Sequence, residues 1–472
     1  MSSYPSYASF FSRSYSNVSH QNFLVEPAAS GTLASHRQMS FRLPSNANLH
    51  MEKTRLLFCL NTAVGTNTIG RLASAKSIID RITVDMGGVS ITSGVASHCV
   101  LQQCFDNMRV IEEDPVLSHS EYLRITVGSG AALGHAATET YSETGNTQYF
   151  SVDLGPFFKS LQPNLFPLSI VPSTEITIFL SGDATVVSSV KSADPLILDA
   201  DLDAGSTQPT YTVDNYRLLV SAYSIDDGVF SEVISSRLNS EDGLDAMFCD
   251  YQGFSDTYDG STRVSSAASS LDKVIVAFRP NQATSGHGGT HASQNFNGVR
   301  TPVPVVGRNN GLQNGTSVAG VFDYASCYGG AKFLNANLNF RAPVNDGNLT
   351  DLPNMPSVSI SINNIRFPSF DAKLGAQSYE LLKEAFEVDN TQSQSLGEYL
   401  ANRCMVATKL NLPGSQQLRA RSGLNLQGSN STILVQNVGS TGNAVNTSNV
   451  LVFLESTCML KLMPGKQLQV MR

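Results

Sequence analysis

Two stretches midway along the chain decide its fold: Asn164-Leu-Phe-Pro-Leu-Ser-Ile-Val-Pro-Ser-Thr-Glu-Ile-Thr-Ile-Phe-Leu-Ser181 and Tyr211-Thr-Val-Asp-Asn-Tyr-Arg-Leu-Leu-Val-Ser-Ala-Tyr223. In the first, a proline-bounded turn precedes a run in which Thr177 alternates with Ile176 and Ile178, the period of a half-buried strand. We predict that this strand closes a first β domain. The second stretch, after a break rich in Asp, Ala and Gly, is predicted to open another domain of the same kind. Two β-sandwiches in tandem, with no catalytic motif attached, indicate a building block rather than an enzyme.

Length and composition limit the possibilities. A chain of 472 residues has room for roughly two to four domains and a large core. Its 36 glycines and its low share of charged residues, 15%, favour many short strands and turns over helical bundles. The formal net charge is −8 and no cluster of basic residues is present, so we expect no nucleic-acid binding by the folded body. No run of about 18 apolar residues exists, and we therefore expect no membrane-spanning helix.

The cysteines indicate the redox environment. They are odd in number and form no Cys-x-x-Cys pair: Cys59, Cys99, Cys104, Cys249, Cys327, Cys404 and Cys458. This usage predicts reduced, mostly buried thiols. The N-terminus has neither the charged start nor the apolar run of a secretory signal, which predicts synthesis in the cytosol.

Residues 1–50 differ from the rest of the chain. They contain a single acidic residue, Glu26, many serines, and spaced arginines and aromatic residues: Tyr4, Tyr7, Phe10, Phe11, Arg13, Tyr15, Arg37 and Arg42. No helical or strand period is visible, so we predict an extended N-terminal arm that becomes ordered only against a partner. The alternative is a flexible tail with no partner.

After Lys53 the pattern becomes that of a β protein. We predict strands at Arg55–Leu60, Ile78–Met86, Tyr122–Val127, Tyr149–Leu154, 174–181, 211–223, Ala246–Tyr251, Leu271–Phe278, Ala331–Arg341, Ser357–Ile362, Met405–Leu410 and Val450–Leu462. Helical patterns cover Ala96–Met108, Phe157–Leu161 and Gln377–Phe386.

A weak internal repeat relates the two halves. Ile362-Asn-Asn-Ile365 takes the place of Met86-Gly-Gly-Val89, and a helix follows each turn. The Gly- and Asn-rich stretches Asn281–Ala319 and Gly428–Ser448 are too long for hairpin turns, which predicts large surface loops.

Four segments in this order carry a resemblance to a known family. They are Ala75–Val89 with the helix after it, Phe166-Pro-Leu-Ser-Ile-Val-Pro with its strand to Leu180, Tyr211–Val220, and Ile360-Ser-Ile-Asn-Asn-Ile-Arg-Phe-Pro368 with the helix containing Tyr379–Phe386. Together they span about residues 51–465. The chain resembles the double jelly-roll major capsid proteins of icosahedral double-stranded DNA viruses, in particular those of virophages and polinton-like viruses. Adenoviruses, tailless phages and large eukaryotic DNA viruses share the fold.

The resemblance implies an all-β fold of two tandem eight-stranded jelly rolls, with short helices between strands and an extended N-terminal arm. We therefore divide the chain into the arm (1–50), a first jelly roll with its linker (51–205) and a second jelly roll with long surface loops (206–472). The resemblance also implies a homotrimer with a pseudo-hexagonal outline that tiles an icosahedral shell. The partners would be neighbouring capsomers, penton proteins and minor or cement proteins. The arm would reach an inner membrane or packaged DNA, and the protein would be made in the host cytosol and reside in the virion.

Candidate chemical sites are few, and none is predicted to be catalytic, cofactor-binding or metal-binding. His287 and His291 have a helical ligand spacing, but Gly288 and Gly289 favour a surface loop. Gly128–Gly134 lacks the spacing of a dinucleotide loop, and Glu112-Glu113-Asp114 is typical of solvated loop charges. Asp199–Gly205 has alternating carboxylates suited to Ca²⁺ but no distal Glu, which favours an inter-domain linker. The glycosylation sequons are as frequent as chance predicts in so Asn-, Ser- and Thr-rich a chain: Asn17, Asn314, Asn348, Asn430 and Asn446.

Three other readings stay open beside a major capsid protein. The first is a tandem β-sandwich module that binds a glycan or receptor, which the long loops would suit. The second is a minor capsid protein on the same fold. The third is an enzyme on a β scaffold, for which no convergent set of His, Ser and acidic residues is visible.

Overall fold

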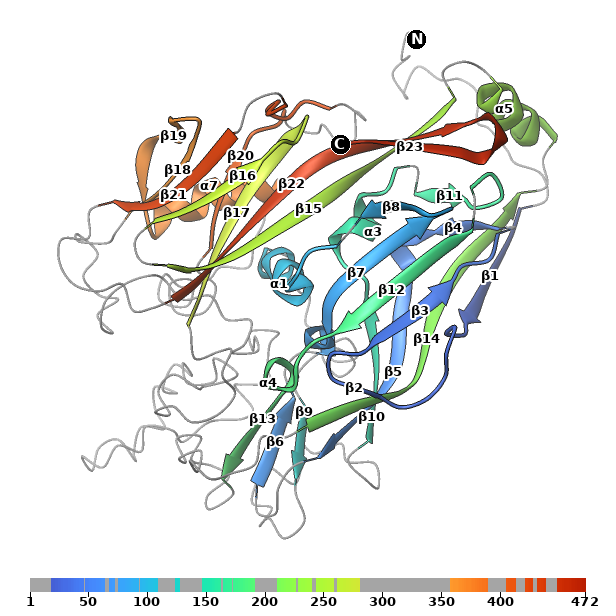
Figure 1. Ribbon diagram of the computed structural model, residues 1–472, viewed down its shortest axis with the longest axis horizontal. Helices are drawn as coiled ribbons and strands as arrows, with labels where there is room; N and C mark the ends of the chain where they lie inside the picture. Colours follow the sequence, from blue (N-terminus) through green and yellow to red (C-terminus); the bar gives the residue numbers. More distant parts are fainter. Residues whose placement is uncertain are drawn as a thin grey trace.

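The computed structural model describes residues 18–108, 124–127, 147–191, 210–280, 357–388, 405–412, 421–427, 431–438 and 448–472, with short gaps at 46, 64–67, 73–74, 93, 163, 172, 226–227, 240–242 and 259–260. The strands form two β-sandwiches that lie side by side (Figure 1). Within these ranges, no helix is both long and apolar enough to cross a bilayer.

The first sandwich consists of two antiparallel sheets. One runs in the order β10-β5-β14, with β1 along the other edge of β14, and three short strands (β2, β4 and β11) extend it. The facing sheet runs β3-β12-β7-β8. A separate three-stranded sheet, β13-β6-β9, lies at one end. The strands are β1 (Val18–Val25), β2 (Leu33–Ala34), β3 (Gln38–Arg42), β4 (Asn48–His50), β5 (Arg55–Ala63), β6 (Thr68–Leu72), β7 (Ile79–Met86), β8 (Val89–Thr92), β9 (Arg124–Val127), β10 (Thr147–Asp153), β11 (Leu165–Pro167), β12 (Thr174–Leu180), β13 (Val187–Lys191) and β14 (Thr210–Ile225).

The second sandwich is built in the same way. Its larger sheet, which we call the central sheet, runs β15-β22-β17-β20, and the last strand, β23, pairs with β22. The facing sheet runs β16-β21-β18-β19. These strands are β15 (Leu244–Tyr258), β16 (Ser261–Ser266), β17 (Leu271–Pro280), β18 (Ser357–Ile362), β19 (Ile365–Lys373), β20 (Met405–Lys409), β21 (Ser431–Val438), β22 (Ser448–Met463) and β23 (Gln467–Met471). The α-helices in the described residues are α1 (His98–Asn107), α3 (Pro156–Ser160), α4 (Asp183–Val186), α5 (Gly228–Leu238) and α7 (Ala376–Phe386), and 3-10 turns occupy Met51–Lys53, Ala75–Ile78 and Pro464–Lys466.

The two sandwiches repeat one topology. The order β10-β5-β14-β1 matches β20-β17-β22-β15, and β3-β12-β7-β8 matches β16-β21-β18-β19. Eight strands in this arrangement make a jelly roll, so the predicted double jelly roll is confirmed. The predicted turn equivalence also holds, because Gly87 and Gly88 (φ 57° and 82°) and Asn363 and Asn364 (φ 51° and 67°) all have the left-handed backbone that a tight two-residue hairpin requires.

The predicted N-terminal arm is wrong for residues 18–50. Strand β1 pairs along its whole length with β14, from Val18 opposite Ile225 to Val25 opposite Leu218. In β3, Met39 and Phe41 point into the core and are 2% and 0% exposed. The sequence conceals these strands because β1 is an exposed edge strand without apolar alternation and β3 is only five residues long. Residues 1–17 lie outside the described part of the chain.

The domain boundary also differs from the prediction. Strand β14 is the closing strand of the first jelly roll, since it pairs with β1, β4 and β5, and it does not open the second. Strand β12 is therefore the penultimate strand of the first roll. The boundary falls after residue 225, with α5 between the rolls, instead of after residue 205. The first and last strands of a jelly roll are neighbours in space but far apart in sequence, so a local pattern cannot tell an opening strand from a closing one.

Most other predicted elements that the structure describes agree with it to within a few residues, but β15 continues to Tyr258, beyond the predicted end at Tyr251. The predicted loop Gly428–Ser448 contains strand β21, whose Ile433 and Val435 are fully buried. Its Asn- and Ser-rich surroundings hide this short apolar alternation. The predicted strand Ala331–Arg341 and the predicted loop Asn281–Ala319 lie outside the described residues.

The central sheet is buried on both faces. Residues 271–278 of β17 and 450–458 of β22 are buried without interruption. Because successive strand residues point to opposite faces, each face must be covered. One face packs on the facing sheet, where Thr408 Oγ1 donates to the Phe367 carbonyl at 3.0 Å. Helix α7 covers the other face along β20, and α1 of the first jelly roll joins it there.

Candidate functional site at the junction of the two jelly rolls

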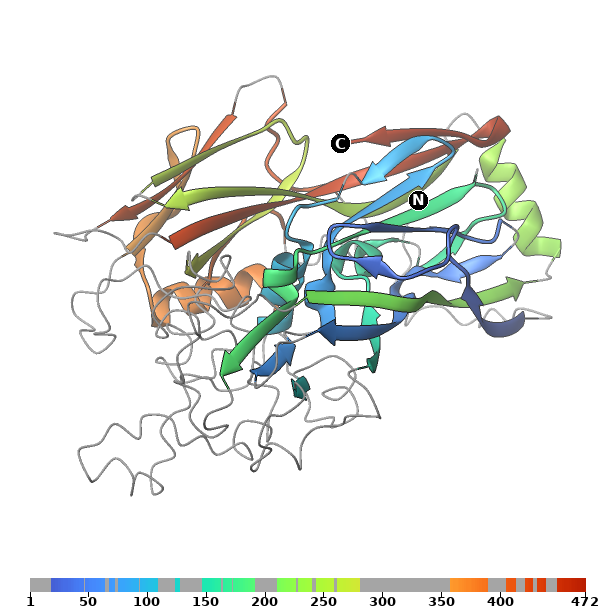
Figure 2. The ribbon, with the colours of Figure 1, turned by 60° about the horizontal axis from the view of Figure 1, so that its bottom comes forward.

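The junction contains an aromatic cluster built by the two repeated helices. The ring of Phe105 in α1 lies edge-to-face against Phe386 of α7, with centroids 5.2 Å apart, and against Tyr251 of β15 at 6.0 Å. Figure 2 shows α1 and α7 meeting beneath the strands of the second jelly roll. Each such pair contributes about 0.5–1.5 kcal/mol beyond the area that it buries. The contact therefore joins equivalent helices of the two rolls.

A second contact extends the junction along β15. The backbone of Gln162, just after α3, exchanges two hydrogen bonds with Met247 of β15, at 2.8 and 2.9 Å. The Cys249 amide donates to Ser160 Oγ at 2.9 Å, and the rings of Phe157 and Phe248 pack at 5.6 Å. Backbone hydrogen bonds between the rolls fix the register as well as the distance, so the rolls form one continuous body here.

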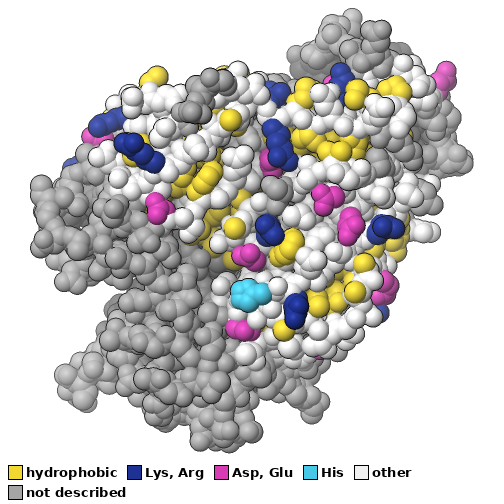
Figure 3. Space-filling view, in the orientation of Figure 1, with side chains coloured by type: hydrophobic (Ala, Val, Ile, Leu, Met, Phe, Trp, Pro, Cys, Tyr) yellow, Lys and Arg dark blue, Asp and Glu magenta, His cyan; other side chains and the backbone are white. Residues whose placement is uncertain are grey.

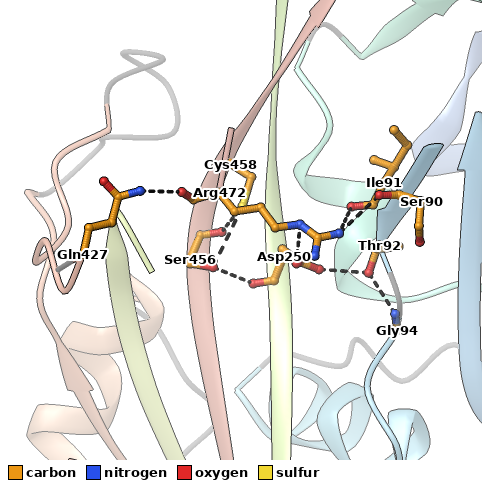
Figure 4. A network of polar contacts seen from close by, with 9 residues as sticks. All are labelled: Ser90, Ile91, Thr92, Gly94, Asp250, Gln427, Ser456, Cys458 and Arg472. Atoms are coloured by element: carbon orange, nitrogen blue, oxygen red, sulfur yellow. Dashed lines mark hydrogen bonds and ion pairs between the residues drawn. The ribbon is translucent and has the colours of Figure 1, made fainter. Parts of the chain in front are cut away.

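A polar network ties the last residue of the chain to the first jelly roll (Figure 4). Arg472 Nη2 donates to the carbonyls of Ser90 and Ile91 in β8, at 3.2 and 3.3 Å, and Arg472 Nε lies 3.8 Å from Asp250 Oδ2. Thr92 Oγ1 donates to Asp250 Oδ1 at 2.9 Å. Burial raises the pKa of Asp250, and the Thr92 hydrogen bond and the Arg472 charge oppose that rise. Arg472 thus satisfies β8 carbonyls and compensates a buried carboxylate with one side chain.

A buried ion pair lies under the aromatic cluster. Lys273 Nζ of β17 is 3.2 Å from Glu455 Oε2 of β22, and both side chains are at least 90% buried. The same ammonium lies 4.8 Å from the ring centroid of Phe386 and 5.6 Å from that of Phe105. A buried charge requires a partner because its desolvation is costly. The Lys273–Glu455 pair and the two rings around it therefore couple the central sheet to both helices.

Three side chains at the buried ion pair are of the types that bind metal ions. Cys249, Asp272 and Glu455 each offer a ligand atom, and these atoms lie within 4.8 Å of one another. However, Lys273 already provides the cation for Glu455, and Thr457 and Ser270 donate hydrogen bonds to the two oxygens of Asp272. Burial raises the pKa of the Cys249 thiol well above its usual value, which keeps it protonated and a poor ligand. We interpret the group as a paired and hydrogen-bonded network that holds β15, β17 and β22 in register.

His98 is a second buried titratable group, at the start of α1. Desolvation lowers its pKa to about 4, although the nearby Asp153 carboxylate acts in the opposite direction. Its ring packs so closely on Gly155 that a Cβ atom there would lie 2.6 Å from His98 Nε2, so glycine is required. Asp153 itself is held by the Gly155 amide and by Lys159, whose Nζ lies 2.7 Å from Oδ2. His98 is therefore kept neutral inside the first jelly roll.

The structure leaves the sequence-predicted candidate sites untested, because they lie outside the described residues. This holds for His287, His291, Gly128–Gly134, Glu112–Asp114, Asp199–Gly205 and the five sequons. Cys59, Cys99, Cys104, Cys249 and Cys458 are buried, as predicted for core thiols, and Cys99 and Cys104 belong to the hydrophobic core. Cys327 and Cys404 are not described.

Sequence reasoning predicted Cys249 as a buried thiol and the two helices as elements, but it identified no contact between the two jelly rolls. A signal was present, because Asp272 and Lys273 interrupt the apolar run of β17, and Glu455 interrupts that of β22. Charges inside a strand that is buried on both faces indicate a buried pair. The pattern does not indicate which charges pair, since Lys273 and Glu455 are 182 residues apart.

We predict that Lys273→Met destabilises the protein by about 3–5 kcal/mol, because it leaves Glu455 buried without its counter-charge. The double variant Lys273→Met/Glu455→Leu should recover most of this loss, since no charge then stays buried. Urea unfolding followed by fluorescence and circular dichroism measures both. Lys373→Met, at an exposed position of β19, serves as the control. A single variant as stable as that control would contradict the importance of the pair.

We predict that acid destabilises the first jelly roll through His98. Folding lowers the pKa of His98 from 6.5 to about 4, so on acidification the unfolded chain takes up a proton before the folded chain does. Neutral His98 therefore contributes about 3 kcal/mol to the free energy of unfolding above pH 6.5, and this contribution is lost as the pH falls through 4. Asp272 acts in the opposite sense, since burial raises its pKa to about 6 and favours the folded state in acid. The free energy of unfolding of His98→Gln should therefore fall less between pH 7 and pH 4 than that of the wild type. Parallel curves for the two proteins would refute the assignment.

Comparisons with known proteins add to this geometry. No protein-family model matches the chain, and no curated protein matches it. Among solved structures, PBCV-1 VP54, fitted into a cryo-EM reconstruction of the virophage Sputnik, is similar at a TM-score of 0.55 with 11% identity, over 99% of each chain. The Faustovirus major capsid protein is similar at a TM-score of 0.55 with 9% identity, over 97% of this chain and 93% of the other. A quasi-atomic model of the PBCV-1 capsid matches at a TM-score of 0.52 with 12% identity, over 99% of each chain.

These similarities extend over both sandwiches and the junction between them. At such low identity they establish the fold, and they agree with the repeated strand order found within the chain. The chain is a double jelly-roll protein with the fold of viral major capsid proteins.

Proposed function

We propose that this chain is the major capsid protein of an icosahedral double-stranded DNA virus, and that it works by self-association into homotrimers with a pseudo-hexagonal outline that tile the shell. One observation carries the proposal: a single chain presents two jelly rolls of identical strand order, locked side by side. Three such chains around a threefold axis provide six nearly equivalent blocks, the number that a hexagonal tile needs. The similarity to major capsid proteins over nearly the whole chain supports a capsid role.

The mechanism is structural, with no chemical step. Each contact between copies covers sheet edges and outer sheet faces, and repetition of one weak contact around a closed ring gives a stable assembly. On the face shown in Figure 3, acidic and basic side chains are mixed and hydrophobic side chains lie between them. A mixed surface of this kind favours specific pairing over attraction by a single-sign field.

The remaining partners follow from the same proposal. Trimers would contact neighbouring capsomers, penton proteins and minor or cement proteins in the virion, after synthesis in the host cytosol. In this proposal the arm is limited to residues 1–17, which contain Arg13 and several aromatic residues. It would contact a neighbouring capsomer, an inner membrane or packaged DNA. A minor capsid protein on the same fold differs only in copy number per virion, which quantitative mass spectrometry of particles measures.

We predict that the purified protein has a mass of about three times 50.6 kDa in solution, with a hexagonal outline in negative stain. Size exclusion with light scattering gives the mass, and images of the same peak give the outline. A compact monomer at every concentration, together with saturable binding on a glycan array, would contradict the proposal and favour a tandem β-sandwich binding module.

We predict that deletion of residues 1–17 leaves folded trimers but impairs shell assembly, because this segment precedes the first described strand. Deletion of residues 1–42 should instead abolish folding, since it removes β1 and β3 and the buried side chains of Met39 and Phe41. Thermal unfolding and electron microscopy of assembly reactions distinguish the two effects. Shells formed equally well by the shorter deletion would eliminate the arm as a connector.

A further inference from the structure

The two repeated helices have different surroundings. In α1, residues 98–104 are buried without interruption, so the helix is covered on all sides. In α7, Ser378, Leu382 and Ala385 are buried on one face only. The opposite face carries Glu380 and Glu384, both exposed and on adjacent turns of the helix. One helix of the pair is therefore covered by both jelly rolls, and the other has an uncovered acidic face.

The contact between α1 and the second jelly roll lies over one row of the central sheet. Its Phe105 lies over a row of residues that are directly opposite one another across the central sheet: Tyr251, Glu455, Lys273 and Lys409. These residues belong to β15, β22, β17 and β20. Since the strand order of the first jelly roll is the same, an equivalent row exists there.

The equivalent row on the first jelly roll is partly exposed. On β1, β14, β5 and β10 the residues directly opposite one another are Leu24, Leu219, Arg55 and Asp153. They lie on the outer face, because Leu56 and Leu218, which alternate with them, are fully buried inside. Leu24 is 44% exposed. A groove of about 550 Å³ opens on this row, and we call it the sheet groove.

The charges of the sheet groove complement those of α7. Its lining includes the cations Lys53, Arg55 and Lys159, the acids Glu52 and Asp153, and the histidines His20 and His50, a formal excess of one positive charge from three cations and two acids. Asp153 is already paired with Lys159 at 2.7 Å.

On α7 the acids are the more exposed members of their own ion pairs. The Glu380 side chain is 69% exposed against 26% for Lys383, and that of Glu387 is 47% against 9% for Lys409. The exposed face of α7 therefore carries mainly acidic charge, whereas the sheet groove has an excess of one positive charge.

We propose that the acidic face of α7 in one copy docks in the sheet groove of a second copy, and so repeats between chains the contact that α1 makes within a chain. The inference rests on the proposed self-association and names its contact surfaces. The contact is heterologous, since it joins different surfaces of two copies, and such contacts close into a ring when the rotation allows it. The acids of α7 then lie over Lys53 and Arg55, and Leu24 is buried beneath the helix.

Charge reversal tests the contact. Neither Glu384 nor Lys53 has an ion-pair partner among the described residues, so reversing either charge breaks no existing pair. Glu384→Lys or Lys53→Glu alone should raise the concentration needed for trimer formation at least tenfold, and Glu384→Lys/Lys53→Glu together should restore it, because the attraction is re-formed with exchanged signs. Sedimentation velocity measures association, and thermal unfolding confirms that each variant is folded. Glu232→Lys, at an exposed position of α5, is the matched control.

Cysteine pairs give a direct readout of proximity. Glu384→Cys/Lys53→Cys should form disulfide-linked oligomers under a mild oxidant on a non-reducing gel, whereas Glu232→Cys/Lys53→Cys should not. A wild-type trimer that is insensitive to both reversals and yields no cross-link would overturn this contact and leave the proposed function intact. A wild-type protein that stays monomeric would overturn the proposed function itself.

Discussion

The structure depends on one constraint: the central sheet of the second jelly roll must be covered on both faces. A sheet with buried residues in unbroken succession cannot leave either side to water. Its own sandwich covers one side, and the other side requires helices, one of them from the first jelly roll. The junction is thus the completion of a hydrophobic core that a single roll cannot close alone. The Lys273–Glu455 pair lies within that core, where removing either charge leaves the other uncompensated.

The two halves share a topology but differ in what covers them. In the second roll the row around Glu455 is closed over by α1, whereas in the first roll the row around Leu219 is open at the sheet groove. The side chains of the two regions differ because α1 buries one and leaves the other in contact with water. Covered positions hold a paired charge and aromatic rings, whereas the sheet groove is lined by basic, acidic and histidine side chains, of which Glu52 and Lys53 are exposed to water.

Much of the fold could be predicted from local pattern, and the failures have a common cause. Ser357–Ile362 and α7 follow from alternation and from an apolar helix face, and the Asn363-Asn364 turn identifies the repeat. Strand β1 could not be predicted, because an exposed edge strand carries no alternation, and β14 was assigned to the wrong roll because its pairing with β1 spans the whole first domain. The junction shows the same limit. Lys273 and Glu455 are each conspicuous within an apolar strand, yet only the folded sheet brings them together.

The pairing of β15 with β22 has a consequence for the order of folding during synthesis. The first jelly roll is complete in sequence once β14 has emerged, so it can fold while the second is still being synthesised. The second cannot: β15 pairs with β22 over its full length, and the guanidinium that reaches β8 lies at residue 472. The central sheet therefore forms only after β22 has been translated. A chain that stops before β22 has a complete first jelly roll but lacks the sheet that packs against α1.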